Sequence, residues 1–138
     1  MGQEMVIFGR TFDFVDWLIN RTQDFPRSQR FVVTKRLQDA ALDFYERILE
    51  ANGCWGKARL RKLRQADVAL DKVRHYLRLA AKWGWLSAGQ YRHAAMMVAE
   101  LGRLLGGWIR QTAKKGRSAD QRAGLEGAPG VAGGRVQQ

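Results

Sequence analysis

The residues of this sequence that are best placed to do chemistry are basic. The run KARLRKLR, which spans residues 57–64, holds five cations in eight positions: Lys57, Arg59, Arg61, Lys62 and Arg64. Ammonium and guanidinium groups pair with phosphate oxygens, and the planar fork of arginine suits them especially well. The run therefore predicts a contact with a polyanion.

Basic residues continue along the same predicted helix and gather on one side of it. At about 100° per residue, six of them fall within roughly 60° of one line, nearly opposite the apolar stripe of the helix. They are Lys57, Arg61, Arg64, Lys72, Arg78 and Lys82. Only Asp67 and Asp71 are acidic on this helix. A solvated helix face is the alternative, but the shortage of acids favours a surface whose counterions a phosphate backbone displaces.

A second, sparser basic row is expected on the next helix. Arg92, Arg103 and Arg110 project together there, well away from the predicted core face. Stacking is a further possibility, because aromatic rings hold unpaired bases. Most of the five tryptophans fit packing positions or helix ends, and Trp55, beside the basic run, is the best stacking candidate.

No catalytic or metal-binding arrangement accompanies these cations. Cys54 is the single cysteine, and the two histidines, His75 and His93, have no acid or thiol arranged around them. The acids between positions 39 and 50 fit a solvated helix face paired with arginines. We therefore predict a protein that is not an enzyme and uses no metal or cofactor.

The charge of the chain is unevenly distributed. There are 24 lysine and arginine residues against 13 acids, a net charge of +11, of which +9 falls in residues 54–112. Such a concentration indicates a nucleic-acid or anionic-membrane partner. No apolar run reaches the roughly 18 residues of a membrane-spanning helix, and the first apolar run is too short for a signal peptide. We expect a cytoplasmic protein that does not enter a membrane.

The elements that must position these residues are helices, since apolar residues recur at helical spacing and never in strand alternation. Helices are expected over residues 11–23, 27–51, 57–83 and 87–112. Pro26 imposes a corner after the first, and Ser87 with Gln90 forms a capping box at the start of the fourth. Short links favour antiparallel neighbours, so residues 1–112 are predicted to form an all-α, antiparallel up-and-down four-helix bundle.

The predicted core stripes follow spacings of three and four residues. In chain order they are Phe12, Val15, Leu18, Ile19 and Thr22; Val33, Leu37, Ala40, Phe44, Ile48 and Ala51; Leu63, Ala66, Leu70, Val73, Leu77 and Ala80; and Tyr91, Ala94, Val98, Leu101, Leu105 and Trp108. Gly102 and Gly106 lie beside the last stripe and indicate close backbone approach. Residues 113–138 have no periodicity and are predicted to be a disordered, basic, Gly/Ala-rich tail.

The helix predicted over residues 27–51 carries more apolar surface than one bundle core needs. Its second stripe either lies under heavy cover within the bundle or packs against another subunit. The candidate interface residues, including two from the following helix, are Phe31, Leu42, Tyr45, Leu49, Val68 and Leu79.

Several short motifs are familiar. They are FP-x-x-QRFV at residues 25–32, LRLA at 77–80, LS-x-x-QY at 86–91 and GRLLGGW at 102–108. Through these motifs, residues 11–110 resemble the accessory variability determinant (Avd) proteins of diversity-generating retroelements.

The resemblance implies a four-helix bundle that assembles into a barrel-like homopentamer and associates with the retroelement's reverse transcriptase. It also implies an accessory role: binding the polymerase and its RNA or DNA, and so supporting error-prone copying of template-repeat RNA into cDNA. The matching basic positions are Arg64, Arg74 and Arg78. The alternative is a ribosome-associated, rRNA-binding bundle similar to the 23S rRNA intervening-sequence proteins, which share this general fold. The GRLLGGW ending favours the first.

Overall fold

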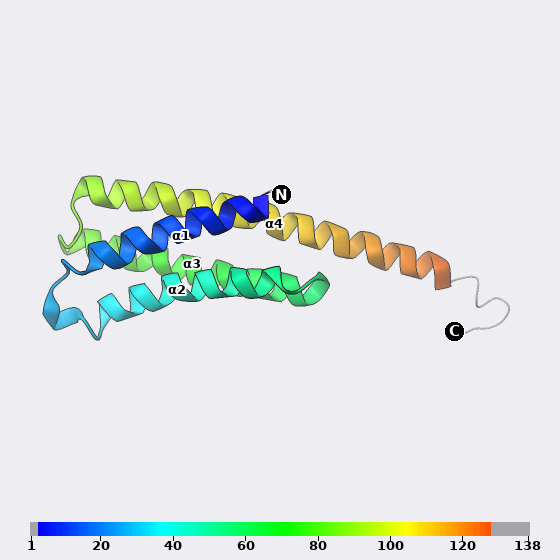
Figure 1. Ribbon diagram of the computed structural model, residues 1–138, viewed down its shortest axis with the longest axis horizontal. Helices are drawn as coiled ribbons and strands as arrows, with labels where there is room; N and C mark the ends of the chain where they lie inside the picture. The colour runs from blue at the N-terminus through cyan, green and yellow to red at the C-terminus, as the bar shows by residue number, and fades with distance from the viewer. Residues whose placement is uncertain (1–2, 128–138) are drawn as a thin grey trace.

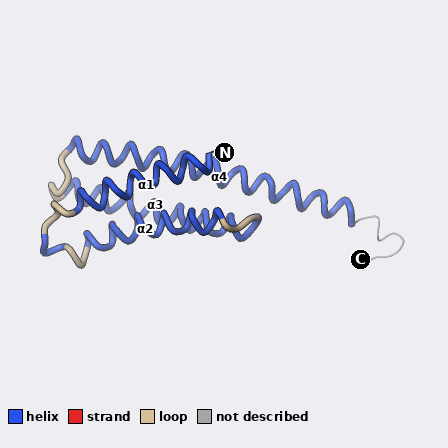
Figure 2. The backbone as a smooth tube through the Cα atoms, in the orientation of Figure 1, coloured by secondary structure: helices blue, strands red, loops and turns tan. Residues whose placement is uncertain are grey.

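The computed structural model describes residues 3–127 of the chain, with side chains from residue 6 to residue 124. Its elements are α1 (Gln3–Thr22), the short 3-10 helix η1 (Arg27–Gln29), α2 (Val33–Asn52), α3 (Gly56–Lys82) and α4 (Ala88–Gly127). The described residues contain helices and loops but no strand, as Figure 2 shows. The all-α prediction is confirmed.

Successive helices run in opposite directions, and the four pack side by side (Figure 1). α1 contacts α2 and α4, and α3 contacts the same two helices, so the bundle is closed in chain order. This is the up-and-down arrangement that short helix links favour, and the predicted four-helix bundle is confirmed.

The core stripes of α2, α3 and α4 lie where the periodicity predicts. Every predicted core residue of α3 is buried, and on the other two helices only Val33 and Tyr91 are half-buried. The buried side chains of all four helices form a single cluster. One continuous core therefore fixes which side of each helix faces outward.

The inward side of α1 differs from the prediction. Its buried line is Ile7, Thr11, Phe14, Leu18 and Thr22. Phe12, predicted to be in the core, is 60% exposed. Because α1 begins at Gln3, earlier than predicted, its first turns bring Ile7 into the core. The side of the helix that carries Ile7 also carries Phe14, so Phe14 is buried in place of Phe12.

The corner between α1 and α2 contains a separate turn that the sequence did not reveal. Instead of a helix beginning at Arg27, η1 forms first and α2 begins at Val33. Phe25 is buried against Trp85, with their ring centres 5.3 Å apart, and this contact anchors the corner to the end of the bundle. Pro26, with ψ of 132°, then turns the chain out of the helical conformation.

The predicted capping box at the start of α4 is confirmed. The Ser87 amide donates to Gln90 Oε1 at 2.9 Å, and the Gln90 amide donates to Ser87 Oγ at 3.1 Å. Two amides of the first turn, which have no partner within a helix, are thereby satisfied.

At its other end, α4 continues well beyond the predicted end at Thr112, to Gly127. Alanine, lysine, arginine and glutamine in this segment favour helix, and a helix that has already nucleated grows at low cost. We call residues 113–127 the α4 extension; it projects past the ends of the other helices (Figure 1). The rest of the predicted tail, residues 128–138, lies outside the described residues.

Candidate nucleic-acid interface

The outward side of α3 is strongly basic. We define the α3 cationic face as the six residues predicted to share one line, all of which are exposed: Lys57, Arg61, Arg64, Lys72, Arg78 and Lys82. None of the six forms an ion pair within the described part of the chain, and the α3 core stripe holds the helix with this side outward. Six mobile cations without acidic partners create a positive surface potential.

Val68 and His75 interrupt the α3 cationic face. Val68 is 56% exposed, and His75 is exposed with its Nδ1 2.9 Å from the Asp71 carbonyl oxygen. The ring of this histidine therefore contacts a backbone carbonyl oxygen rather than an acid or thiol side chain.

Three other basic residues predicted to bind nucleic acid are half-buried and have partners within the protein. Lys62 Nζ lies 3.0 Å from Glu50 Oε1, and Arg74 Nη1 lies 2.6 Å from Asp71 Oδ1. Arg59 donates from Nε to the Ala51 carbonyl oxygen at 3.0 Å. Lys62 and Arg59 thus join α3 to the end of α2, whereas the Arg74 ion pair lies within α3.

Glu50 accepts hydrogen bonds from two helices. The hydrogen bond from Lys62 lowers the pKa of Glu50 most, partial burial opposes the shift, and Arg47 lowers it further by hydrogen bonding and charge. The carboxylate joins the end of α2 to the beginning of α3, where the α3 cationic face starts.

One of the glycines of α4, Gly102, leaves room for a side chain from α3. A methyl group added there would collide with Nη2 of Arg74, which reaches across from α3. The group that approaches Gly102 is therefore an arginine side chain and not the backbone that we expected from the glycine.

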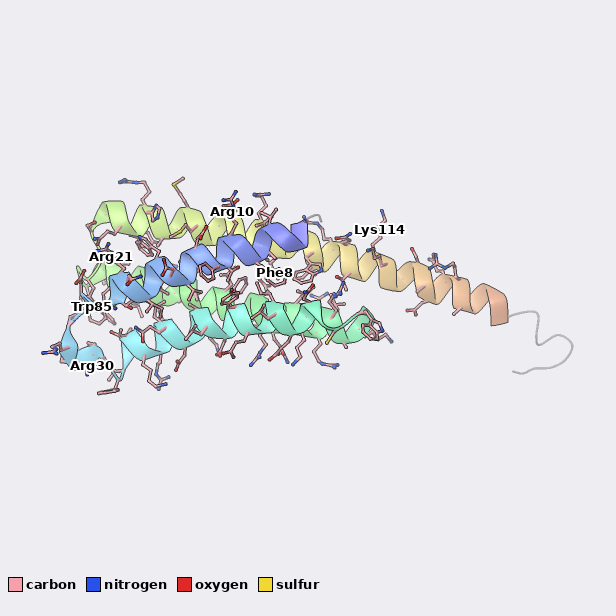
Figure 3. All side chains as sticks on the ribbon, viewed as in Figure 1. Phe8, Arg10, Arg21, Arg30, Trp85 and Lys114 are labelled. Atoms are coloured by element: carbon pink, nitrogen blue, oxygen red, sulfur yellow. The ribbon has the colours of Figure 1, made fainter. Side chains whose placement is uncertain are left out.

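The predicted row on α4 is exposed as well. Arg92 and Arg110 have no ion-pair partner among the described residues, whereas Arg103 lies 3.6 Å from Glu100, which also pairs with Arg10. Continued at 100° per residue, the row also includes Lys114 and Arg117 of the α4 extension. Lys114 is labelled in Figure 3. Sequence reasoning missed these two because it ended the helix at Thr112, although their 4-3 spacing from Arg110 carries the signal.

Not all residues of the predicted oligomer interface lie on one helical stripe, because Phe31 lies apart from the others. Leu42, Leu49 and Val68 are exposed, and Tyr45 and Leu79 are half-buried. Phe31 is 78% exposed, but it precedes the first residue of α2, so helical periodicity does not place it on the same stripe. It lies instead against the guanidinium of Arg30, 5.6 Å from the ring centre.

Among the described residues, no group of three or more His, Cys, Asp or Glu is arranged to hold a metal ion. No helix in the same range is long and apolar enough to cross a membrane.

This chain resembles known proteins in its fold and, separately, in its sequence. A crystal structure of a protein of unknown function from the S23 ribosomal protein family of Bacteroides thetaiotaomicron superposes with a TM-score of 0.72. It is 20% identical, and the superposition covers 78% of this chain and 98% of that one, which shows a shared fold.

No curated protein matches the sequence. A family model described as bAvd-like matches residues 5–112, which include α2, α3 with its cationic face, and most of α1 and α4, but not the α4 extension. The chain belongs to the bAvd-like family.

Proposed function

We propose that this protein is the non-catalytic accessory subunit of a diversity-generating retroelement, where it binds the reverse transcriptase and its RNA or cDNA and supports mutagenic cDNA synthesis. Family membership supports an Avd-type accessory role. The single observation that carries nucleic-acid binding is the α3 cationic face, whose six side chains are exposed and have no ion-pair partner in the described structure.

The physical basis is counterion release. A phosphate backbone that contacts this face displaces the ions condensed along it, and the affinity gained in this way falls steeply as salt rises. Lys62 and Arg74, each held by an acid, contribute less than the exposed cations. The exposed stripe of Leu42, Leu49 and Val68 is where further copies of the chain pack in a homo-oligomer, which the family resemblance makes a pentamer.

The test is a charge reversal on the α3 cationic face. R64E/R78E changes two exposed residues and should lower affinity for template-repeat RNA at least tenfold and flatten the dependence of affinity on salt. R27E/R36E makes the same change in charge on η1 and α2 and is the matched control. Equal weakening by both pairs would show that net charge, rather than this face, binds the RNA.

The polymerase partner is tested separately. The proposal requires a reverse-transcriptase gene beside the gene for this protein, and that polymerase, co-expressed with the full chain, should co-purify with it after nuclease treatment. Loss of the polymerase on nuclease treatment would mean that RNA bridges the two proteins, and failure to co-purify at all would remove the polymerase from the proposal.

A further inference from the structure

A groove of about 370 Å³ lies where the α2–α3 turn faces the α4 extension. Trp55 and Arg59 line it from the turn and the first part of α3, and Lys115, Gly116 and Ala119 line it from the extension. Trp108, Gln111 and Thr112 complete its α4 side. The groove exists only because α4 continues past Thr112, beyond the residues that the family model matches.

An exposed tryptophan is the main feature of this groove. Trp55 is 79% exposed, and it precedes Gly56, whose φ of +62° favours glycine. An aromatic ring that stays in water gains no stabilisation from burial, so the exposed Trp55 ring in the lining of this groove is suited to covering a flat ligand. Across the groove, Gly116 and Ala119 leave space, since a methyl group on Gly116 would meet nothing within 4 Å.

The charge of the groove is positive. None of its lining residues is acidic, and two of them are the cations Arg59 and Lys115. Arg59 is already fixed, by its hydrogen bond to the Ala51 carbonyl and by the Trp108 ring, whose centre lies 5.7 Å from the guanidinium carbon. A cation fixed before binding loses little freedom when it pairs with an anion. Gly56, the first residue of α3, also lines the groove, and the first turn of this helix has no side-chain cap.

The exposed ring of Trp55 lies in one groove with two cations, Arg59 and Lys115. Such a groove suits a ligand that consists of a flat ring attached to an anion. We propose that this Trp55 groove binds an unpaired nucleotide of an RNA or DNA strand, with the base stacked on Trp55 and the phosphate beside Arg59 and Lys115. The inference rests on the proposed nucleic-acid function and adds to it a site for single strands. The α3 cationic face suits a backbone of any form, whereas this groove requires a base that is free to stack.

The experiment compares a 12-nucleotide oligouridylate with a blunt RNA duplex, using the full-length protein. W55A should weaken binding of the single strand about tenfold and leave duplex binding unchanged, while W55Y should keep most of the affinity. G116L should also weaken single-strand binding, because it fills the groove without changing charge; helicity by circular dichroism confirms folding. K115E should weaken single-strand binding more than R122E, which makes the same change in charge at an exposed position of the α4 extension outside the groove.

The outcomes distinguish failure of the groove assignment from failure of the proposed function. If W55A, G116L and K115E all bind oligouridylate as tightly as wild type while R64E/R78E binds weakly, the groove assignment is wrong and the proposed function stands. If wild type binds neither probe, both fail. If W55A loses the reverse transcriptase but keeps oligouridylate, the groove holds a protein segment and the nucleotide assignment is overturned.

Discussion

Glu50 is held by cations from two helices, Arg47 on α2 and Lys62 on α3. Because its pKa is lowered in the folded protein, its contribution to stability is present above the unfolded-state value of about 4.3 and is lost as pH falls through the folded value. K62Q should raise the pKa of Glu50 towards its ordinary value. Carbon-detected NMR titration of the carboxylate measures this, with K82Q, at the far end of α3, as the control. An unchanged Glu50 pKa in K62Q would contradict the role of this hydrogen bond.

Gly102 and Arg74 should be energetically coupled. Replacing glycine by alanine in a helix interior ordinarily stabilises by about 1 kcal/mol, but here the new methyl group displaces the Arg74 guanidinium. G102A should therefore stabilise the protein less in the wild-type background than in R74A. Urea unfolding of the four proteins in this cycle gives the coupling, and equal gains in both backgrounds would show that Arg74 moves aside without cost.

The sequence identified the exposed basic residues but not the partners of all of them. Lys57 and Arg64 could be placed on the outer side of α3 because helical periodicity determines which residues share a face of the helix. The contacts of Arg59 with Ala51 and Trp108 could not be predicted, because they depend on how α3 packs against both the end of α2 and α4. The partners of long side chains depend on how the helices pack against one another.

At the scale of whole elements, the capping box fixes where α4 begins. S87A removes the acceptor for the Gln90 amide and should lower the free energy of unfolding by about 1 kcal/mol. Denaturant unfolding measures the loss. S118A, an exposed serine in the interior of the same helix, should change stability by no more than a few tenths of a kcal/mol. A loss of similar size in both variants would argue against capping.

Helix ends were harder to predict than helices. The capping box and the corner at Pro26 carry local chemical signals, and both lie where expected. The start of α1 and the end of α4 carry none, and the structure extends both helices. In the α4 extension, Gly116 and Gly124 reduced the helical signal, yet the helix continues through them because it is already nucleated by the packed part of α4.

At the scale of the whole molecule, the exposed apolar stripe predicts self-association. L49E/V68E places charges on two residues that are 51% and 56% exposed, so the isolated bundle should remain folded while the oligomer dissociates. Light scattering of purified protein measures the mass. M96E, at a residue 68% exposed on α4, is the control and should leave the mass unchanged. A wild-type monomer at micromolar concentration would contradict the oligomer.

The fold followed from the sequence because four amphipathic helices with short links have few ways to bury their stripes. The subunit number and the polymerase-binding surface that we propose could not be derived from the sequence, since both depend on other chains. The Trp55 groove was also beyond the sequence, because it requires the spatial meeting of the α2–α3 turn with the α4 extension.

The α4 extension has one more consequence, for proteolysis. Lys114, Lys115, Arg117 and Arg122 are exposed there on a helix that the other described helices do not flank, so local opening should be far more frequent than in the bundle. Trypsin should cut this segment first and leave a resistant fragment that ends near Thr112. A strand bound beside Lys115 would slow that first cut, so the lifetime of the intact chain under protease would report how much of the groove is filled.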